Sequence, residues 1–327
     1  MDTLGEIAAA FRIGSLVAAP RQLKGAEVVA VSAGNGSFVV KTEQSPPSWR
    51  LDAMRMTGRV ESAALAAGLE IALPVEPPSG HETAGYWARF GDQWFRVSEL
   101  LTGVHPRPPF DIRTATWLGV TVARLARLGL PGDVRDDPSR PLYPAHDWAP
   151  WLDDAARAGL ACAPVLRAAV PVIAEATALV QAALVGPVEA RLMHRDLSGR
   201  NILRTSAGLR LLDFDYAGPE VPWWEAVAVA VRSAQAADLA EPSEPSLRAL
   251  LAGYAEADGP IGSADHSAFA GLVWSQVAMA AYSLWVAAGH RGGDAVRRAA
   301  ADRDAVHLAG ALTHTMSSLD RWVDLLR

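Results

Sequence analysis

The segment from His194 to Asn201, which reads His-Arg-Asp-Leu-Ser-Gly-Arg-Asn, has the residue types and the spacing that phosphoryl transfer requires. Asp196 can orient an incoming hydroxyl and accept its proton, and Asn201 can hold a magnesium ion that bridges nucleotide phosphates. The segment fits the catalytic-loop pattern H-R-D-L-x-x-x-N at every fixed position. We therefore predict that Asp196 is catalytic and that Asn201 is a metal ligand.

A second acidic segment, Asp213-Phe214-Asp215, begins twelve residues after Asn201 and follows a leucine-rich run. This pattern predicts a short strand that ends at Asp213, where a second magnesium ligand is needed. Residues 202–203 and 211–212 are predicted to pair as a hairpin that turns at 206–208. The two motifs together predict phosphoryl-transfer chemistry far more specifically than either motif alone.

The block from residue 194 to residue 225 resembles the aminoglycoside phosphotransferase family, which is related to protein kinases and choline kinases. The resemblance implies an α+β, bilobal protein-kinase-like fold with a small β-rich N-lobe and a larger, mainly helical C-lobe. It implies that Asp196 is the catalytic residue and that Asn201 and Asp213 bind magnesium. It also implies that His194 and Arg195 are members of the catalytic loop.

Two positions in this block depart from the commonest family pattern. Arg195 stands where glycine is usual, and Glu225 stands where aspartate is typical. We expect Glu225 to buttress the backbone of the catalytic loop, as the aspartate of the family does.

Upstream, Phe38-Val39-Val40-Lys41 resembles the strand that delivers the phosphate-binding lysine of these enzymes. Lys41 follows a predicted hairpin and precedes a predicted helix, which is the place of that lysine in an N-lobe. The resemblance implies a glutamate of the helix as its partner. We expect this partner to be Glu61, with Asp52 and Glu70 as weaker alternatives.

The nucleotide-binding segments are less distinctive. The loop at 23–28 has a single glycine, Gly25, where kinases have several, and the chain has no G-x-x-x-x-G-K-[ST] motif, which counts against a P-loop NTPase. Residues 97–103 resemble the kinase hinge, so the backbone of Glu99 and Leu101 is expected to bind the nucleobase. The implied cofactors are ATP or GTP as phosphate donor, together with Mg²⁺.

An acceptor site is expected to involve C-lobe helices that carry many tryptophans. The candidates for this site are Asp147, Trp148, Trp151, Asp215, Trp223, Trp224, Glu225, Tyr282 and Trp285. The alternative is that the tryptophans fill the core of the lobe. A polycationic acceptor would need an acidic pocket, to which the pairs at 136–137 and 153–154 are possible contributors.

These residues must be positioned by two kinds of secondary structure. Ala33-Gly34-Asn35-Gly36 between two apolar runs predicts a β-hairpin, and after Gly103 the composition changes to helical patterns rich in alanine and leucine. We predict an N-lobe at residues 1–102 and a C-lobe at 103–327. Strands are expected at 16–23, 26–32, 37–42, 71–74, 85–90 and 94–99, and helices at 49–68, 112–128, 148–158 and 164–184.

Composition excludes several other classes of protein. The net charge of −6 argues against nucleic acid as a partner, and the single cysteine, Cys162, allows no intrachain disulfide. Residues 269–289 carry no charge, but internal polar residues favour a helix buried in the protein over a membrane span. The acidic N-terminus differs from a secretory signal, so we expect a cytoplasmic protein.

We therefore predict an ATP- or GTP-dependent O-phosphotransferase that transfers the γ-phosphate to a hydroxyl of a small molecule, with an antibiotic as the favoured acceptor. One alternative is a primary-metabolite kinase of the choline or homoserine kinase type. Another is a pseudokinase that only binds nucleotide, although such proteins usually lose part of the catalytic set that is intact here. A protein kinase is disfavoured because the chain after Asp213 leaves no room for an activation loop.

Overall fold

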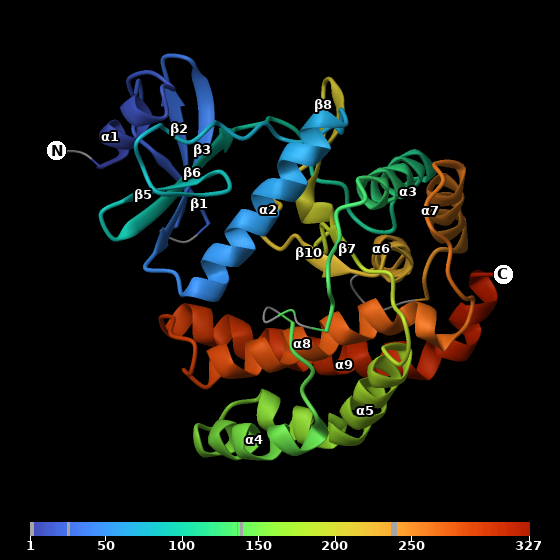
Figure 1. The fold of residues 1–327 in the computed structure, drawn as a ribbon. Helices are drawn as coiled ribbons and strands as arrows, with labels where there is room; N and C mark the ends of the chain where they lie inside the picture. Colours follow the sequence, from blue (N-terminus) through green and yellow to red (C-terminus); the bar gives the residue numbers. More distant parts are fainter. Residues whose placement is uncertain (1–2, 25–26, 136, 138–139, 237–240) are drawn as a thin grey trace. The chain divides into compact units, whose positions relative to one another are not determined.

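A computed structural model describes residues 3–24, 27–135, 137, 140–236 and 241–327. Its contacts divide the chain into two compact units (Figure 1). The first unit contains residues 1–107, 124–130 and 192–218, and the second contains 108–123, 131–191 and 219–327. The predicted N-lobe, 1–102, makes up most of the first unit, but this unit also includes the predicted catalytic loop, 194–201, because the hairpin that follows the loop is hydrogen-bonded to the N-terminal segment.

The first unit is built on one antiparallel sheet with the strand order β1-β2-β3-β6-β5-β4. Its strands are β1 (Arg21–Lys24), β2 (Val28–Ala33), β3 (Gly36–Gln44), β4 (Thr83–Ala84), β5 (Trp87–Phe90) and β6 (Gln93–Glu99). The predicted hairpin is confirmed: Ala33 pairs with Gly36 across a two-residue loop, Gly34-Asn35. The loop residues are Gly34 and Asn35, and Gly36, with a φ of 139°, begins β3.

Successive side chains of these strands point to opposite faces of the sheet, and each face packs against a different helix. Val40, Phe95 and Val97 share a hydrophobic cluster with Ile7 and Phe11 of α1 (Thr3–Ala10) and its following loop. Trp87 and Trp94 instead cluster with Met54 of α2 (Ser48–Ala66). Because successive strand residues point to opposite faces, Lys41 and Arg96 lie on the face that α2 covers.

The helix predicted at 49–68 is confirmed, including its glycine at position 58. A Cβ atom at Gly58 would collide with the backbone of Gly85, at the turn between β4 and β5. The glycine that weakens the helical pattern therefore allows α2 to lie against the sheet.

The first unit is completed by the catalytic loop and the hairpin of β8 (Ile202–Thr205) and β9 (Gly208–Leu211). The hairpin turns at residues 206–207, as predicted from the sequence. Backbone hydrogen bonds between Val104 and Arg204, and from Leu211 to Glu70, join it to the N-terminal segment. His105 Nδ1 also lies 2.9 Å from the carbonyl oxygen of Ile202.

The second unit is helical. Its helices are most of α3 (Ile112–Arg127), α4 (Trp148–Arg157), α5 (Cys162–Ala183), α6 (Pro222–Ala234), α7 (Glu244–Glu256), α8 (Ala270–Ala287) and α9 (Ala295–Leu325), with short 3₁₀ turns at Ala145–Asp147 and His266–Phe269. The strands β7 (Arg191–Met193) and β10 (Gly218–Glu220) contain the points where the chain passes between units. Helices α5, α8 and α9 pack against one another.

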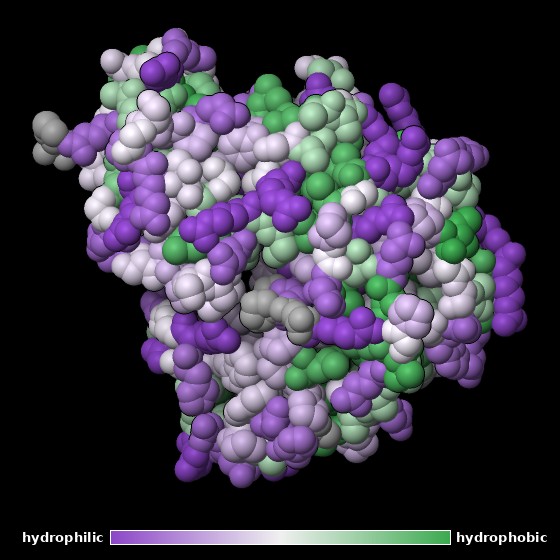
Figure 2. Space-filling view, in the orientation of Figure 1, coloured by the Kyte–Doolittle hydropathy of each residue, from purple (hydrophilic) through white to green (hydrophobic). Residues whose placement is uncertain are grey.

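Two helical segments of the described chain are long and apolar enough to span a membrane by length and composition, 162–183 and 266–287. In the second segment, 67% of the apolar window is buried within the protein, which agrees with the predicted core helix. Figure 2 shows hydrophilic side chains over much of the visible face of each unit, with hydrophobic residues in small groups among them.

Candidate active site

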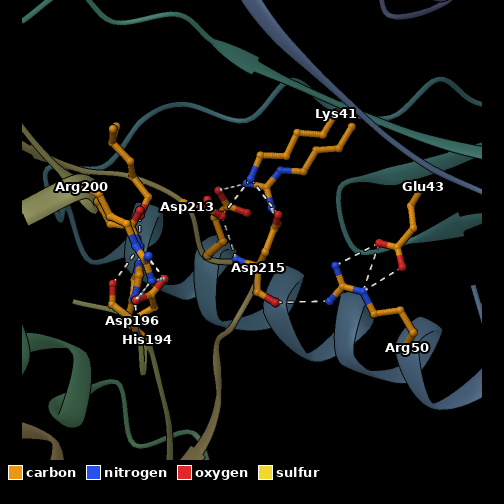
Figure 3. A network of polar contacts seen from close by, with 12 residues as sticks. Lys41, Glu43, Arg50, His194, Asp196, Arg200, Asp213 and Asp215 are labelled. Atoms are coloured by element: carbon orange, nitrogen blue, oxygen red, sulfur yellow. Dashed lines mark hydrogen bonds and ion pairs between the residues drawn. The ribbon is translucent and has the colours of Figure 1, made fainter. Parts of the chain in front are cut away.

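The centre of the first unit's polar network is Lys41, on β3. Its Nζ atom lies 2.8 Å from Oδ1 of Asp213 and 2.7 Å from Oδ2 of Asp215 (Figure 3). The three residues come from segments that are about 170 positions apart in the sequence. The fold thus joins the predicted phosphate-binding lysine to the predicted metal-binding aspartate.

Arg96 is the direct cross-strand partner of Lys41 in the pairing of β3 with β6. Its Nη1 atom lies 3.2 Å from Oδ1 of Asp215, and its Nη2 atom lies 2.6 Å from Oε1 of Glu61. The expected ion pair between Lys41 and Glu61 is therefore wrong. Glu61 is paired with Arg96 because the guanidinium occupies the space between the helix and the sheet, and Lys41 is paired with the two aspartates.

Lys41 and Asp215 hold each other ionised. Burial raises the pKa of Asp215, but Lys41 and Arg96 lower it by more, so that its pKa lies well below the ordinary value. Burial lowers the pKa of Lys41, whereas Asp215 and Asp213 raise it, and the balance is a raised pKa. A positive ammonium group is thus maintained at this position.

Arg50, on α2, extends the network. Its Nη1 atom donates to the backbone oxygen of Asp215 at 3.2 Å, and its Nε atom lies 3.1 Å from both carboxylate oxygens of Glu43 (Figure 3). Asp215 is therefore held at its side chain and at its backbone by three cations. The sequence suggested Asp215 for the acceptor site, but the structure places it in the lysine cluster.

The catalytic loop forms a second group of contacts. The Nδ2 atom of Asn201 donates to the backbone oxygen and to Oδ2 of Asp196, both at 2.8 Å. Arg200 Nη2 lies 3.0 Å from Oδ1 and 3.2 Å from Oδ2 of the same carboxylate (Figure 3). These contacts fix the orientation of the Asp196 side chain.

His194 connects the catalytic loop to the Asp213 segment. Its Nε2 atom lies 3.0 Å from the backbone oxygen of Leu212, and its Nδ1 atom lies 3.3 Å from the amide nitrogen of Asp196. Only a neutral ring with its proton on Nε2 can donate to the carbonyl and accept from the amide. Burial lowers the pKa of His194 by more than the Leu212 carbonyl and the nearby carboxylates raise it, which favours this neutral form.

Arg195 and Asp213 both have left-handed backbone conformations, with φ values of 64° and 59°. Such values are uncommon for residues other than glycine, and for an arginine more so than for an aspartate. Here the side chain has a structural use, because Arg195 Nε donates to the backbone oxygen of Tyr216 at 2.8 Å. Gly218 leaves space for the guanidinium of Arg195, because a Cβ atom on residue 218 would collide with it.

The donor atoms fit a magnesium ion that is bound together with a nucleotide. Asn201 Nδ2 donates to two oxygens of Asp196, so the amide oxygen, Oδ1, is the atom of this side chain that could bind a metal. Asp213 has the more exposed of the two carboxylates at Lys41, 41% against 21% for Asp215. The described residues contain no group of three or more His, Cys, Asp or Glu side chains that could hold a metal alone. Mg²⁺ usually takes its remaining ligands from phosphates and water.

The predicted nucleobase-binding residues lie at the end of β6 and just after it. Glu99 accepts a hydrogen bond from the amide of Leu73 through Oε1 at 2.7 Å, and the backbone amide of Leu100 donates to Ser37. Leu101 follows in the segment towards the second unit. Gly25 lies outside the described residues. The roles of these residues in nucleotide binding stay predictions.

In the second unit, the structure brings together some of the acceptor candidates. The rings of Trp151 and Trp285 meet edge to face with centroids 4.8 Å apart, and Tyr143 meets them at 5.6 and 5.1 Å. Trp148 lies against Trp151 at 5.7 Å but is fully buried. Nothing in the sequence pattern singled out Tyr143.

The other acceptor candidates are separate from this aromatic group. Trp223, Trp224 and Glu225 are buried in α6, and Trp223 donates to the backbone oxygen of Ser263, so these tryptophans fill the core. Tyr282 accepts from Arg297 at 3.2 Å, and Asp147 lies at the start of α4, where it is partly exposed. Of the acidic residues considered for a polycation, Asp136 lies outside the described residues.

The two acidic residues of α4 already have cationic partners. Asp153 Oδ1 lies 2.8 Å from Arg167 Nη2, and Asp154 pairs with Arg157. Above Trp285, the guanidinium carbon of Arg291 lies 5.0 Å from the ring centroid. The described part of this region is therefore of mixed charge rather than acidic.

A sheet-based unit with a cationic cluster, a helical unit, and a catalytic loop with Asp and Asn define a kinase-like phosphotransferase. The sequence profile of the phosphotransferase enzyme family matches residues 21–260, and the chain belongs to this family. It is an enzyme that transfers a phosphoryl group to a hydroxyl group. Among curated proteins, none has a sequence that matches this chain.

Solved structures with the same fold include kinases for antibiotics and for a metabolite. A spectinomycin phosphotransferase in complex with ADP and spectinomycin has a TM-score of 0.67 and 12% identity over 95% of this chain and 98% of its own. An amicoumacin kinase in complex with AMP-PNP has a TM-score of 0.61 and 14% identity over 95% and 94%. The choline kinase of Streptococcus pneumoniae has a TM-score of 0.53 and 16% identity over 94% and 98%. At these identities the similarity concerns the fold.

Proposed function

We propose that the enzyme transfers the γ-phosphate of ATP or GTP to a hydroxyl of a small molecule, with Asp196 as the catalytic residue. The observation that carries this proposal is the contact of Lys41 with Asp213 at 2.8 Å. This contact supports a role for Lys41 in binding the phosphates and for Asp213 in binding their counter-ion, the two charges that phosphoryl transfer requires. The occurrence of ADP and AMP-PNP in solved structures of this fold supports a nucleotide as donor.

Lys41 supplies the fixed positive charge of the site. Its ammonium group is held by two carboxylates and has a raised pKa, so it stays charged at neutral pH. When a nucleotide binds, phosphate oxygens can replace part of the contact with the more exposed Asp213, while Asp215 continues to hold the lysine. A cation positioned in advance stabilises the negative charge of the transferred group without reorganisation.

Asp196 receives the proton of the acceptor. In the transfer step, the acceptor oxygen forms a bond to the γ-phosphorus, the bond from that phosphorus to the β,γ-bridging oxygen breaks, and the hydroxyl proton passes to the Asp196 carboxylate. The nucleoside diphosphate is the leaving group. Asn201 keeps the carboxylate in one orientation, and correct positioning contributes much of the rate in such reactions.

Asn201 Oδ1 and the Asp213 carboxylate would hold Mg²⁺. When bound, this ion neutralises charge on the nucleotide phosphates. His194 contributes by position only, since its neutral ring joins the segments that carry Asp196 and Asp213.

We propose an antibiotic as the acceptor, bound in part by the aromatic group of Tyr143, Trp151 and Trp285. Aromatic side chains offer large contact areas with defined geometry for a ring-containing molecule. The ion pairs of Asp153 and Asp154 with arginines argue against a polycation as the acceptor. A primary-metabolite kinase would use the same catalytic set, and the acceptor screen separates the two functions.

The test is a screen for Mg²⁺-dependent phosphate transfer from ATP and GTP to a panel of antibiotics and hydroxylated metabolites, with Asp196→Asn as control. Transfer to an antibiotic that is lost in the control supports the proposal. Transfer only to a metabolite would contradict an antibiotic as acceptor and identify a metabolite kinase. Nucleotide binding without transfer to any acceptor or to water would contradict an active enzyme and favour a pseudokinase.

A further inference from the structure

Arg200 lies directly on the catalytic carboxylate. Its Nη2 atom is 3.0 Å from Oδ1 and 3.2 Å from Oδ2 of Asp196 (Figure 3). Asn201 contacts Oδ2, so Arg200 is the residue that engages Oδ1 among the contacts of this side chain that the structure defines. An acceptor hydroxyl that transfers its proton to Asp196 has to approach the same two oxygens.

The position of Arg200 is not required by the fold. Its side chain is 70% exposed, whereas that of Asp196 is 27% exposed, so the arginine is the more accessible partner of this ion pair. Exposed ion pairs add little to stability and are easily exchanged. Arg195, the other arginine of the loop, has a structural contact instead, because it donates to the backbone oxygen of Tyr216. Arg200 can therefore move aside when an acceptor enters, and its charge stays within one side-chain length of Asp196.

We infer that Arg200 selects acceptors with an oxyanion, such as a carboxylate or phosphate, beside the reacting hydroxyl and disfavours acceptors with an ammonium group there. The inference rests on the proposed phosphotransferase function. A guanidinium binds a carboxylate or phosphate through two parallel hydrogen bonds, so an oxyanion of the acceptor can replace Asp196 as its partner. The same exchange frees Asp196 to accept the hydroxyl proton, whereas an ammonium group would meet a like charge.

The second unit has the same charge preference in its aromatic group. Arg291 lies over the ring of Trp285, on which a quaternary ammonium group would otherwise stack. Asp153 and Asp154 have Arg167 and Arg157 as partners. Within the second unit, the aromatic group thus disfavours a cation.

The test compares analogues of the acceptor that the screen identifies. The group beside its hydroxyl is varied from carboxylate to carboxamide to aminomethyl, and kcat/KM is measured for the wild type, Arg200→Ala and Arg200→Lys. Arg55→Ala is the matched control, because Arg55 also pairs with a nearby aspartate, Asp52 at 2.7 Å, and is 49% exposed. Hydrolysis of ATP in the absence of acceptor is measured in parallel.

In the wild type we expect the carboxylate analogue to be the best acceptor. Arg200→Ala should lower kcat/KM for it by about tenfold to a hundredfold and raise kcat/KM for the aminomethyl analogue, so that the preference is lost. Arg200→Lys should keep part of the preference, since it retains the charge without the two-point geometry. Arg55→Ala should leave the preference unchanged.

Two outcomes would overturn the inference. An equal loss of kcat/KM for all analogues, together with a loss of ATP hydrolysis, would show that Arg200 acts on the transferred phosphoryl group. An unchanged preference among the analogues in Arg200→Ala would show that Arg200 does not select the acceptor. Failure of the proposed function would be distinct, because the wild type would then bind nucleotide without transfer to any analogue or to water.

Discussion

Lys41 and Arg96 stand directly opposite each other on neighbouring antiparallel strands, and both point to the face of the sheet that α2 covers. Like charges in such cross-strand positions repel each other. Asp215 resolves the repulsion because Lys41 contacts its Oδ2 atom at 2.7 Å and Arg96 contacts its Oδ1 atom at 3.2 Å. The position of Lys41, the proposed phosphate-binding residue, therefore depends on the Asp215 carboxylate, which need not touch the substrate.

Replacement of Asp215 by asparagine should destabilise the protein by about 3 kcal/mol, because the amide leaves two neighbouring cations without their shared counter-charge. The matched change Asp213→Asn removes a more exposed carboxylate that pairs with Lys41, and we expect a loss of about 1 kcal/mol or less. Urea denaturation of both variants tests the difference. Equal losses would contradict a bridging role for Asp215.

The buried pair of Glu61 and Arg96 should behave as a unit. Arg96→Met leaves the buried Glu61 carboxylate without its cation and should destabilise the protein by roughly 3–5 kcal/mol. Glu61→Gln should cost less, because Arg96 keeps its contact with Asp215. The double variant should lose less than the sum of the two single losses, since it removes both charges together. A double-mutant cycle from urea denaturation measures the coupling, and additive losses would show that the two groups act independently.

Much of the scaffold around the candidate site could be predicted from the sequence because it rests on local signals. The Asn-Gly pair fixes the hairpin before Lys41, and the spacing between Asp196 and Asn201 allows both side chains to act on one substrate. Gly58, which weakened the helical pattern, is explained by the close approach of Gly85, a relation between distant segments.

The partners of the charged residues could not be predicted, because they depend on strand register and on the packing of α2. Arg96 lies within a predicted strand, but its place opposite Lys41 follows only from the pairing of β3 with β6. Glu61 was expected to pair with Lys41 because the sequence does not reveal that Arg96 lies opposite Lys41. Arg200 occupies a variable position of the H-R-D-L-x-x-x-N pattern, directly before Asn201. The pattern gives no role to this position, so the arginine was not singled out. Tyr143 carried no signal of its own.

The buried imidazole of His194 should make stability depend on pH. Its pKa is lowered in the folded protein, while the unfolded chain has the ordinary value of about 6.5. The unfolded state therefore binds the proton first, so the stabilisation is complete above about pH 6.5 and declines as the pH falls towards the folded-state pKa. Urea denaturation between pH 5 and 8 measures this slope. His194→Asn should be less stable overall and should lack this part of the slope; an unchanged slope would exclude His194 as its source.

Asp196 and Lys41 should affect different kinetic constants. Asp196→Asn keeps the shape of the side chain but removes the proton acceptor and the charge that pairs with Arg200, so kcat should fall by a factor of about 100 to 10,000 while the affinity for ATP changes little. Lys41→Met removes a cation that contacts phosphates in the bound and the transition state, so KM for ATP should rise and kcat should also fall, by a factor of about 100 or more. Steady-state kinetics with the acceptor from the screen, together with calorimetric titration of ATP, separates the two effects.

Arg55→Ala, on the exposed side of α2, is the control and should match the wild type in both measurements. Near wild-type turnover in Asp196→Asn would remove this residue from the transfer step, and unchanged ATP affinity in Lys41→Met would remove the lysine from phosphate binding.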